Sequence, residues 1–313
     1  GLAIGSRAKG EAWISVYGFL MKLFDALPGD MIGEKGAAAP SDLFKTDFDG
    51  CEPLGGKKRK IYHTIAASAL YAGIRARPGA QLAASFHSAR VKEPGQHGWR
   101  KLCWAMKYLQ VAKALPLILK ADGKGPGLRA GAAHASHHGF KSHAGAAAME
   151  VKGATHSSSS KAKLSTISST ESEVAGAGER LPKHLWLRGF RAEQGGYPKE
   201  DALCQGNEAA ILLESNGRYS CKKGSRHIHI RYFFIAGRAK SKEMKVMCCP
   251  TESMIADYFT KPLQGMLFYK FRDAIMGIDQ NDLELYQRNF DEVIKKYEQL
   301  KREAEAAAAA DKA

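Results

Sequence analysis

The segment that most constrains the fold of this chain is Ser168-Ser169-Thr170-Glu171-Ser172-Glu173-Val174-Ala175, together with the residues that follow it. Thr170 followed three residues later by Glu173 matches a capping box, so the sequence predicts a helix that begins here. Apolar side chains then recur at helical spacing and predict one buried stripe: Val174, Ala177, Leu181 and Leu185. Trp186 and Leu187 extend the apolar surface near the end of the helix. Pro182 is compatible with a kink or a break in this helix. Read by itself, Glu173 is a capping residue and nothing more.

The charge of the chain is its second constraint. Its 313 residues are enough for one or two domains with a hydrophobic core, and a hydrophobic content of 44% is ordinary for a globular protein. The net charge of +15 is not ordinary and is typical of a protein that binds a polyanion. A basic surface without a specific partner, or adhesion to anionic membranes, is the alternative explanation.

Several classes of protein are disfavoured. No apolar run approaches the ~20 residues of a membrane span, and the start does not resemble a secretory signal. Gly1 is not an initiator residue, so we expect the chain to begin within a longer product or after processing. The six cysteines include no Cys-x-x-Cys pair, and we interpret them as reduced thiols of a cytoplasmic or nuclear protein.

Four separated segments carry a family resemblance. They are Ser168 to Glu173, His184 to Arg188, Arg226 to Phe234, and the run Ala256-Asp257-Tyr258-Phe259-Thr260-Lys261-Pro262-Leu263. In order and spacing these segments resemble the ribonuclease H domain of copia-type retrotransposon Pol polyproteins. The resemblance covers roughly residues 20 to 280 and suggests a degenerate copy of the C-terminal part, with the reverse-transcriptase connection and the ribonuclease H domain.

The resemblance implies an α/β fold: a ribonuclease H-like mixed five-stranded sheet flanked by helices, preceded by a helical connection segment and followed by a C-terminal helix. It implies four parts, namely a remnant of the reverse-transcriptase C-terminal segment (1–56), a helical connection region (57–122), a ribonuclease H-like domain (123–280) and a charged C-terminal helix (281–313). No Tyr-x-Asp-Asp-like pair of aspartates occurs, so a polymerase site is not expected.

The local patterns predict most of the individual elements. Helices are expected from about residue 57 to 75, from 81 to 90 and from 99 to 111, the first ended by Arg75-Ala76-Arg77-Pro78. Three antiparallel strands are implied between 128 and 168, where alanine and glycine give poor strand propensity. The elements expected next are, in order, a strand at 202–205, a helix at 208–214, a strand at 244–249, a helix capped by Thr251 and a helix after Pro262. Residues 227–234 alternate as in a strand, whereas the resemblance implies a helix there.

The resemblance also implies a catalytic site. The family uses four acidic residues to hold two Mg²⁺ ions, which prefer hard oxygen ligands. Glu173 matches the helix glutamate and Asp257 the late aspartate, whereas His134 and Gly206 occupy the two remaining aspartate positions. Because imidazole is a poor magnesium ligand and glycine offers only its backbone, we expect Mg²⁺ binding at Glu173 and Asp257 to be weak or lost. Asp122 and Glu208 lie near the lost positions, but neither matches the motif.

Basic side chains along the chain are candidates for phosphate contacts. They are Arg75, Arg77, Arg90, Lys92, Lys101, Arg226, Arg231 and Lys261. Each of them could equally lie on a merely solvated face. Five histidines invite a transition-metal site instead, although their spacing suits a strand poorly: His134, His137, His138, His143 and His156.

Two functions are therefore in competition. The first is a retrotransposon-derived ribonuclease H-like domain, whose ancestral cleavage of the RNA strand of RNA–DNA hybrids by two-metal hydrolysis is impaired. The second is a non-catalytic basic protein that binds nucleic acid or acts as a scaffold. The expected partner is an RNA–DNA hybrid or another nucleic acid, without a membrane.

Overall fold

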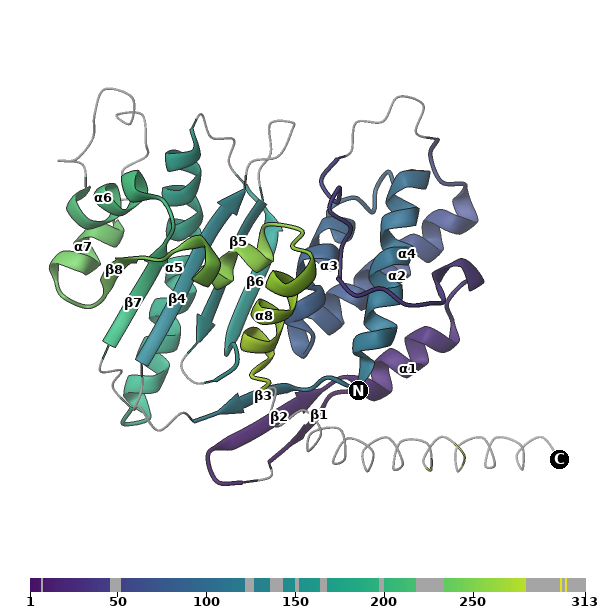
Figure 1. The fold of residues 1–313 in the computed structure, drawn as a ribbon, viewed down its shortest axis with the longest axis horizontal. Helices are drawn as coiled ribbons and strands as arrows, with labels where there is room; N and C mark the ends of the chain where they lie inside the picture. Colours follow the sequence, from purple (N-terminus) through teal and green to yellow (C-terminus); the bar gives the residue numbers. More distant parts are fainter. Residues whose placement is uncertain are drawn as a thin grey trace.

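The computed structural model describes residues 1–6, 8–45, 52–121, 127–135, 143–149, 152–163, 168–196, 200–217 and 234–279, together with 299 and 302. The segment 227–233 and nearly all of the predicted C-terminal helix lie outside these residues. Figure 1 shows the order of the elements: β1 Ala3–Gly5, β2 Glu11–Ser15, α1 Tyr17–Asp25, α2 Gly56–Arg75, α3 Gln81–Ser88, α4 Gln96–Val111, β3 Leu117–Lys120, β4 Gly127–Ala135, β5 His143–Met149, β6 His156–Lys161, α5 Ser169–Glu193, β7 Glu200–Gln205, α6 Glu208–Asn216, α7 Phe234–Lys240, β8 Lys245–Cys248 and α8 Gly265–Met276.

A mixed five-stranded sheet organises the C-terminal part. Its strand order is β6-β5-β4-β7-β8, in which β4, β5 and β6 are mutually antiparallel. β7 runs parallel to β4, and β8 runs parallel to β7. Three antiparallel strands, a long helix and then two strands added beside the first strand are the arrangement of the ribonuclease H-like fold. The predicted fold class is therefore confirmed.

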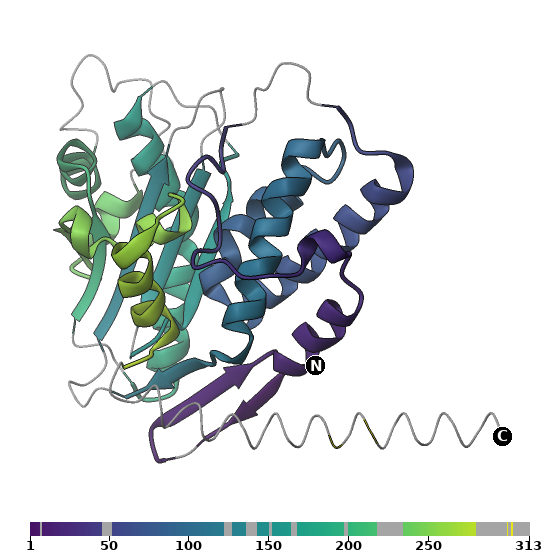
Figure 2. The same cartoon turned by 45° about the vertical axis from the view of Figure 1, so that its right-hand side comes forward.

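Helices cover both faces of this sheet (Figures 1 and 2). On one face, α5 and α7 pack on β7 through a cluster that includes Leu181, Leu203 and Ile235. On the other face, α3 contacts β6, and the short 3-10 helix Ile255–Phe259 contacts β4 and β5. Covering both faces explains why β5 is buried along six of its seven residues.

The small residues of β5 allow the 3-10 helix Ile255–Phe259 to pack closely on this strand. A Cβ atom placed on Gly145 would lie 2.5 Å from Cβ of Phe259 and 2.9 Å from its carbonyl carbon. Strand propensity alone disfavours β5. The strand nevertheless forms, because its alanine and glycine residues let the 3-10 helix approach the sheet closely.

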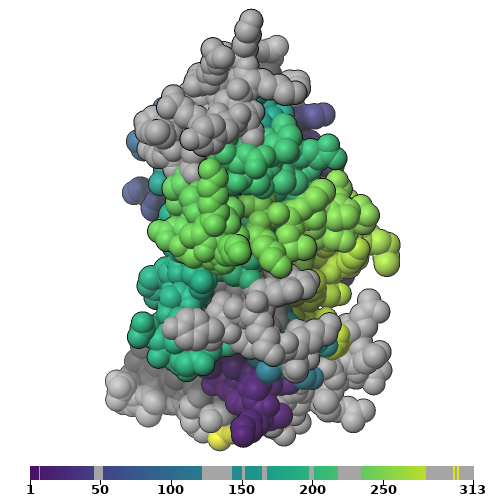
Figure 3. All heavy atoms as spheres, turned by 90° about the vertical axis from the view of Figure 1, so that its left-hand side faces the viewer, coloured from purple at the N-terminus to yellow at the C-terminus, as the bar shows by residue number. Residues whose placement is uncertain are grey.

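The N-terminal part packs against the same sheet. Strands β1, β2 and β3 form a small antiparallel sheet, at the foot of the molecule in Figure 1. Helices α1 to α4 form a layer whose core, including Leu102 and Met106, is continuous with Phe259 and Phe271 of the C-terminal part. In Figure 3 the purple N-terminal strands lie below the green segments of residues 200–260. The division into parts at 56, 122 and 280 stays a prediction.

Helix α5 runs for 25 residues and passes through Pro182 without ending. Its N-cap is Ser168, whose side chain accepts a hydrogen bond from the Glu171 amide at 3.1 Å. The predicted cap at Thr170 is therefore wrong by two residues, because the preceding serine reaches the first free amides of the helix. Trp186, on the apolar surface near the end of the helix, is 56% exposed.

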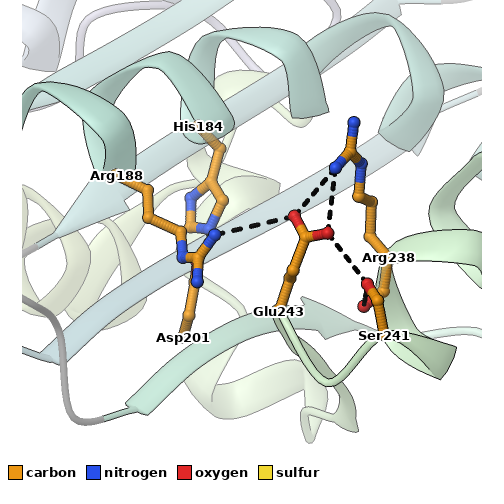
Figure 4. A network of polar contacts seen from close by, with 6 residues as sticks. All are labelled: His184, Arg188, Asp201, Arg238, Ser241 and Glu243. Atoms are coloured by element: carbon orange, nitrogen blue, oxygen red, sulfur yellow. Dashed lines mark hydrogen bonds and ion pairs between the residues drawn. The ribbon is translucent and has the colours of Figure 1, made fainter. Parts of the chain in front are cut away.

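A polar network joins α5 to the amino end of β7 (Figure 4). His184 of α5 and Asp201 of β7 are both buried and joined by a hydrogen bond. Nε of Arg188 lies 3.3 Å from Oδ2 of Asp201, and its Nη1 lies 3.6 Å from Oε2 of Glu243. Arg238 donates to both oxygens of Glu243 at 2.9 Å. The network thus ties α5, β7 and the turn between α7 and β8 together.

Most of the other predicted helices and strands are present, although their ends are shifted. One predicted helix is absent. Instead of the helix expected after Thr251, the structure has two 3-10 helices, Thr251–Ser253 and Ile255–Phe259. Close packing on β5 explains the difference, because a short 3-10 segment can follow the sheet surface where a longer α-helix would diverge from it.

Candidate functional site

The candidate site is a pocket of about 440 Å³ at the carboxyl end of β7. Its lining comes from four parts of the chain: the first turns of α5, the end of β7, the start of α6 and the segment from 251 to 261. The lining residues are Glu173, Gln205, Gly206, Asn207, Glu208, Ala209, Thr251, Met254, Asp257 and Lys261. The structure therefore brings Glu173, Gly206 and Asp257 around one pocket, although they are far apart in the sequence.

His134 lies at the same end of the sheet. Strand β4 is parallel to β7, with Gly131 paired to Cys204, so His134 lies three residues beyond the level of Cys204. At that level β7 has already ended, and the chain has passed Gly206 and reached Asn207, the N-cap of α6. The backbone register thus places His134 and Gly206 at the same end of two neighbouring strands.

Each acidic residue is positioned by its element. Glu173 lies in the first turns of α5, because the cap at Ser168 sets where that helix begins. Asp257 lies in the 3-10 helix Ile255–Phe259 and is 7% exposed. Its Oδ2 accepts a hydrogen bond from Nζ of Lys261 at 2.7 Å. One negative charge of the pocket is thereby neutralised by an internal cation.

A buried polar pair that the sequence did not reveal supports the floor of the pocket. The Gln205 amide donates to Oε1 of Glu214 at 3.3 Å and accepts from the backbone N–H of Gly206 at 2.9 Å. The pKa of Glu214 is raised to about 8, mainly by burial; the Gln205 hydrogen bond opposes this shift, and the charge of Glu173 contributes to it. A glutamate inside the apolar run of α6 is the only sequence signal for this residue.

Glycine at 206 leaves room in the pocket. A Cβ atom at this position would lie 3.5 Å from Cε of Met254 and 4.0 Å from the Cys249 carbonyl oxygen, both ordinary contacts. A Cβ atom, the first atom of an aspartate side chain, could therefore be carried here without moving the backbone.

The donor set does not fit a two-metal magnesium site. Within the described ranges, no three histidine, cysteine, aspartate or glutamate side chains are grouped closely enough to hold a metal ion. Asp257 is already paired with Lys261, and Gly206 has no side-chain oxygen. Of the alternative histidine cluster, His137 and His138 lie outside the described residues, and His143 and His156 are strand residues of β5 and β6.

The predicted phosphate contacts divide into several groups. Arg75 and Lys92 are exposed, and Lys261 lines the pocket. Arg90 is half-buried, with its guanidinium 3.8 Å from the Phe86 ring centroid. Arg226 and Arg231 lie outside the described residues.

Two of these predictions need correction. Arg77 is 2% exposed and donates to the carbonyl oxygens of Ala76 and Lys113, and burial lowers its pKa to about 10. Lys101 is 3% exposed and donates to three backbone carbonyls, those of Asp42, Leu43 and Lys45, at 2.5, 2.9 and 2.8 Å. Both cations are used to hold the helical layer together, so neither is available to a phosphate.

Comparison with known proteins supports the resemblance seen in the motifs. The chain is 28% identical over 234 residues to the "Retrovirus-related Pol polyprotein from transposon TNT 1-94" of Nicotiana tabacum. The chain is similar to a retrotransposon Pol polyprotein. The match covers 74% of this chain but only 17% of the tobacco protein, and it confirms the predicted resemblance. No protein-family profile matches the chain.

Two solved structures also align with the chain. One is the N-terminal ribonuclease H domain of a Mycobacterium tuberculosis protein, with 13% identity, 44% of this chain and 91% of that chain covered, and a TM-score of 0.32. The other is LC11 ribonuclease H1 in complex with an RNA/DNA hybrid, with 13% identity, 42% and 93% coverage, and a TM-score of 0.31. Both scores are low, so the assignment of the fold rests on the strand order and directions of the sheet.

Among the described residues, the structure has no helix with the length and apolar composition of a membrane span.

Proposed function

We propose that this chain carries a ribonuclease H-like domain of retrotransposon origin in which cleavage of the RNA strand of RNA–DNA hybrids is impaired. The observation that carries the proposal is the composition of the pocket at the end of β7. Glu173 and Asp257 line it together, while Gly206 takes a position where the family resemblance implies a carboxylate. Half of the four acids expected of a two-metal site are replaced, the second replacement being His134.

Glu173 and Asp257 alone do not supply enough ligands for two divalent ions. Two divalent ions in such a site must be held by several hard oxygen ligands, and each lost carboxylate removes both a ligand and a charge. The Lys261 ammonium on Asp257 opposes a divalent ion further. We therefore expect Mg²⁺ to bind weakly or not at all at Glu173 and Asp257.

Restoring the two acids tests the proposal. The double variant His134→Asp with Gly206→Asp should cleave the RNA strand of a labelled hybrid in Mg²⁺, whereas the natural chain should cleave no faster than its Glu173→Gln variant. Gly206 is suited to this change because a Cβ atom there meets only ordinary contacts. His134→Asp with Gly237→Asp is the matched control, since a Cβ at Gly237 meets nothing within 4 Å and lies in α7, away from the pocket.

Two results would contradict the proposal. If the natural chain cleaves the hybrid and Glu173→Gln abolishes the cleavage, the activity is not impaired. If the restored variant folds but neither cleaves nor binds Mn²⁺, measured by calorimetry, the pocket is not the descendant of a ribonuclease H site.

A second function is favoured by the net charge of +15, namely non-catalytic binding of nucleic acid or a scaffold role. An electrophoretic shift of a hybrid or duplex that weakens with added salt would support binding. The absence of any shift at low salt would remove the binding function and leave only the scaffold role.

A further inference from the structure

Two exposed aromatic side chains lie next to each other on the C-terminal half of α5. Trp186 is 56% exposed and Phe190 is 47% exposed. Their rings are stacked, with centroids 5.4 Å apart and an interplanar angle of 12°. The ammonium of Lys183 lies 4.1 Å from the centroid of the Trp186 ring. We call Lys183, Trp186 and Phe190 the aromatic column.

The aromatic column does not serve the packing of α5. The buried stripe of this helix, with Ala177 and Leu181, faces β7 and α7 on another side. A stacked pair of large rings presents more continuous apolar surface to solvent than scattered single side chains do, and such a patch is characteristic of a binding surface. A cation held over the tryptophan gives this surface a positive charge at one end.

The aromatic column is separate from the pocket at the end of β7. Trp186 follows Glu173 by 13 residues of the same helix, which corresponds to about 20 Å along the axis and a rotation of about 140° around it. The three side chains of the column start about 15 to 25 Å along the helix axis from Glu173, so a base bound to the column would not occupy the pocket.

We propose that the aromatic column binds single-stranded nucleic acid without sequence preference, as a function additional to the one proposed above. Aromatic rings that solvent can reach stack on bases of any kind, and a lysine beside them suits the phosphate backbone. The net charge of +15 favours a polyanion over an apolar protein surface as the occupant. A base would stack on the exposed ring surface while the Lys183 ammonium meets a phosphate.

Binding of a fluorescein-labelled oligo(dT) of about 15 nucleotides, followed by anisotropy with the full chain, tests the inference. The double variant Trp186→Ala with Phe190→Ala should bind at least about tenfold more weakly. Trp186→Phe should retain most of the affinity because it keeps an aromatic face, whereas Trp186→Leu should not. Lys183→Met should reduce the slope of log affinity against log salt by about 0.7.

Matched controls separate stacking from a general loss of surface. Leu212→Ala removes another exposed apolar side chain, on α6, and Lys22→Met removes an exposed lysine of α1. Both should leave the affinity within about twofold. If the double variant binds oligo(dT) as the natural chain does, the inference is wrong. The inference is also wrong if the only effect of the double variant is a change from dimer to monomer, measured by light scattering. The column is then a contact between copies of the chain.

Intrinsic fluorescence provides a measurement that does not depend on an alanine variant folding. The chain has four tryptophans, and the other three, at positions 13, 99 and 104, are buried or half-buried. Oligo(dT) should quench the emission of the natural chain, and Trp186→Phe should abolish most of that quenching. Quenching that persists in Trp186→Phe would overturn the inference. Because Glu173→Gln should not alter this signal, failure here is distinguishable from failure of the proposed pocket.

Discussion

At the scale of single residues, burial decides what each charged or polar group does. Arg77 and Lys101 look like phosphate ligands in the sequence, yet both donate to backbone carbonyls inside the helical layer. His87 is fully buried in the same layer, where its Nδ1 is 2.8 Å from the Tyr62 hydroxyl. Such groups contribute to stability only while their protonation state suits the interior.

His87 therefore makes stability depend on pH. Its pKa is lowered from 6.5 to about 3, mainly by burial; a backbone hydrogen bond at Lys101 opposes this shift, and the charges of Arg90 and Lys101 contribute to it. The folded state therefore keeps the imidazole neutral, while the unfolded state takes up a proton below pH 6.5. Stability from this group is present above pH 6.5 and is lost as the pH falls toward 3. Between pH 7.5 and 5 the loss should be about 2 kcal/mol. Urea denaturation at the two pH values measures it, and His87→Gln should show a pH difference smaller by that amount. An unchanged pH difference in the variant would contradict the assignment.

At the scale of elements, α5 has three separate tasks along its 25 residues. Its first turns place Glu173 at the pocket, its middle buries Leu181 against the sheet, and its last turns expose the aromatic column. The position where the helix begins fixes all three, because each further residue turns the side chain by about 100°.

The cap at Ser168 can be tested directly. Ser168→Ala should lower the free energy of unfolding by about 1 kcal/mol, since the Glu171 amide loses its acceptor. Thr170→Ala should instead be neutral or slightly stabilising, because this residue lies inside the helix, where alanine is favoured. Thermal and urea denaturation of the two variants would distinguish the caps. A larger loss at Thr170 would restore the cap predicted from the sequence.

The close contact between β5 and the 3-10 helix predicts a pair of opposite effects. Gly145→Ala should destabilise the fold by about 1–3 kcal/mol, because its Cβ would lie 2.5 Å from Cβ of Phe259. Gly189→Ala, in an exposed position of α5 with nothing within 4 Å, should stabilise it by about 0.5–1 kcal/mol. Denaturation midpoints measure both changes, and a Gly145→Ala variant as stable as the natural chain would show that the helix does not approach so closely.

At the scale of the whole molecule, one continuous core joins the helical layer to the face of the five-stranded sheet. Leu102 of α4 and Phe271 of α8 belong to the same cluster. The helical layer therefore supports the segment that carries Asp257, although most of its own residues are distant from the pocket in sequence. The chain as a whole carries a net charge of +15.

That charge predicts a strong dependence of nucleic-acid binding on salt. Affinity for an RNA–DNA hybrid should fall at least about tenfold between 50 and 200 mM salt, because each phosphate contact releases condensed counterions. Anisotropy titrations at several salt concentrations give the slope. A flat salt dependence would show that the basic surface does not contact the phosphate backbone.

Local sequence signals were sufficient for the elements with strong patterns. The apolar spacing of α5 and α8, and the proline that follows α2, are set by neighbours in the chain and were predicted nearly in full. The 3-10 helix Ile255–Phe259 was predicted as an α-helix, and β5 seemed unfavourable, because packing between distant segments determines both. Gln205, which lines the pocket, and Glu214, to which it donates, were missed for the same reason, since only their burial side by side makes them notable.

The sequence by itself determined the family resemblance, the ribonuclease H-like fold class, and the identities of Glu173, Asp257, His134 and Gly206, because residue type and spacing are properties of the chain. Only the tertiary structure decided that Glu173, Gly206 and Asp257 share a pocket, that Arg77 and Lys101 are buried, and that Trp186 and Phe190 face solvent. These are relations between distant segments, or between a side chain and solvent, and they exist only after the core has formed.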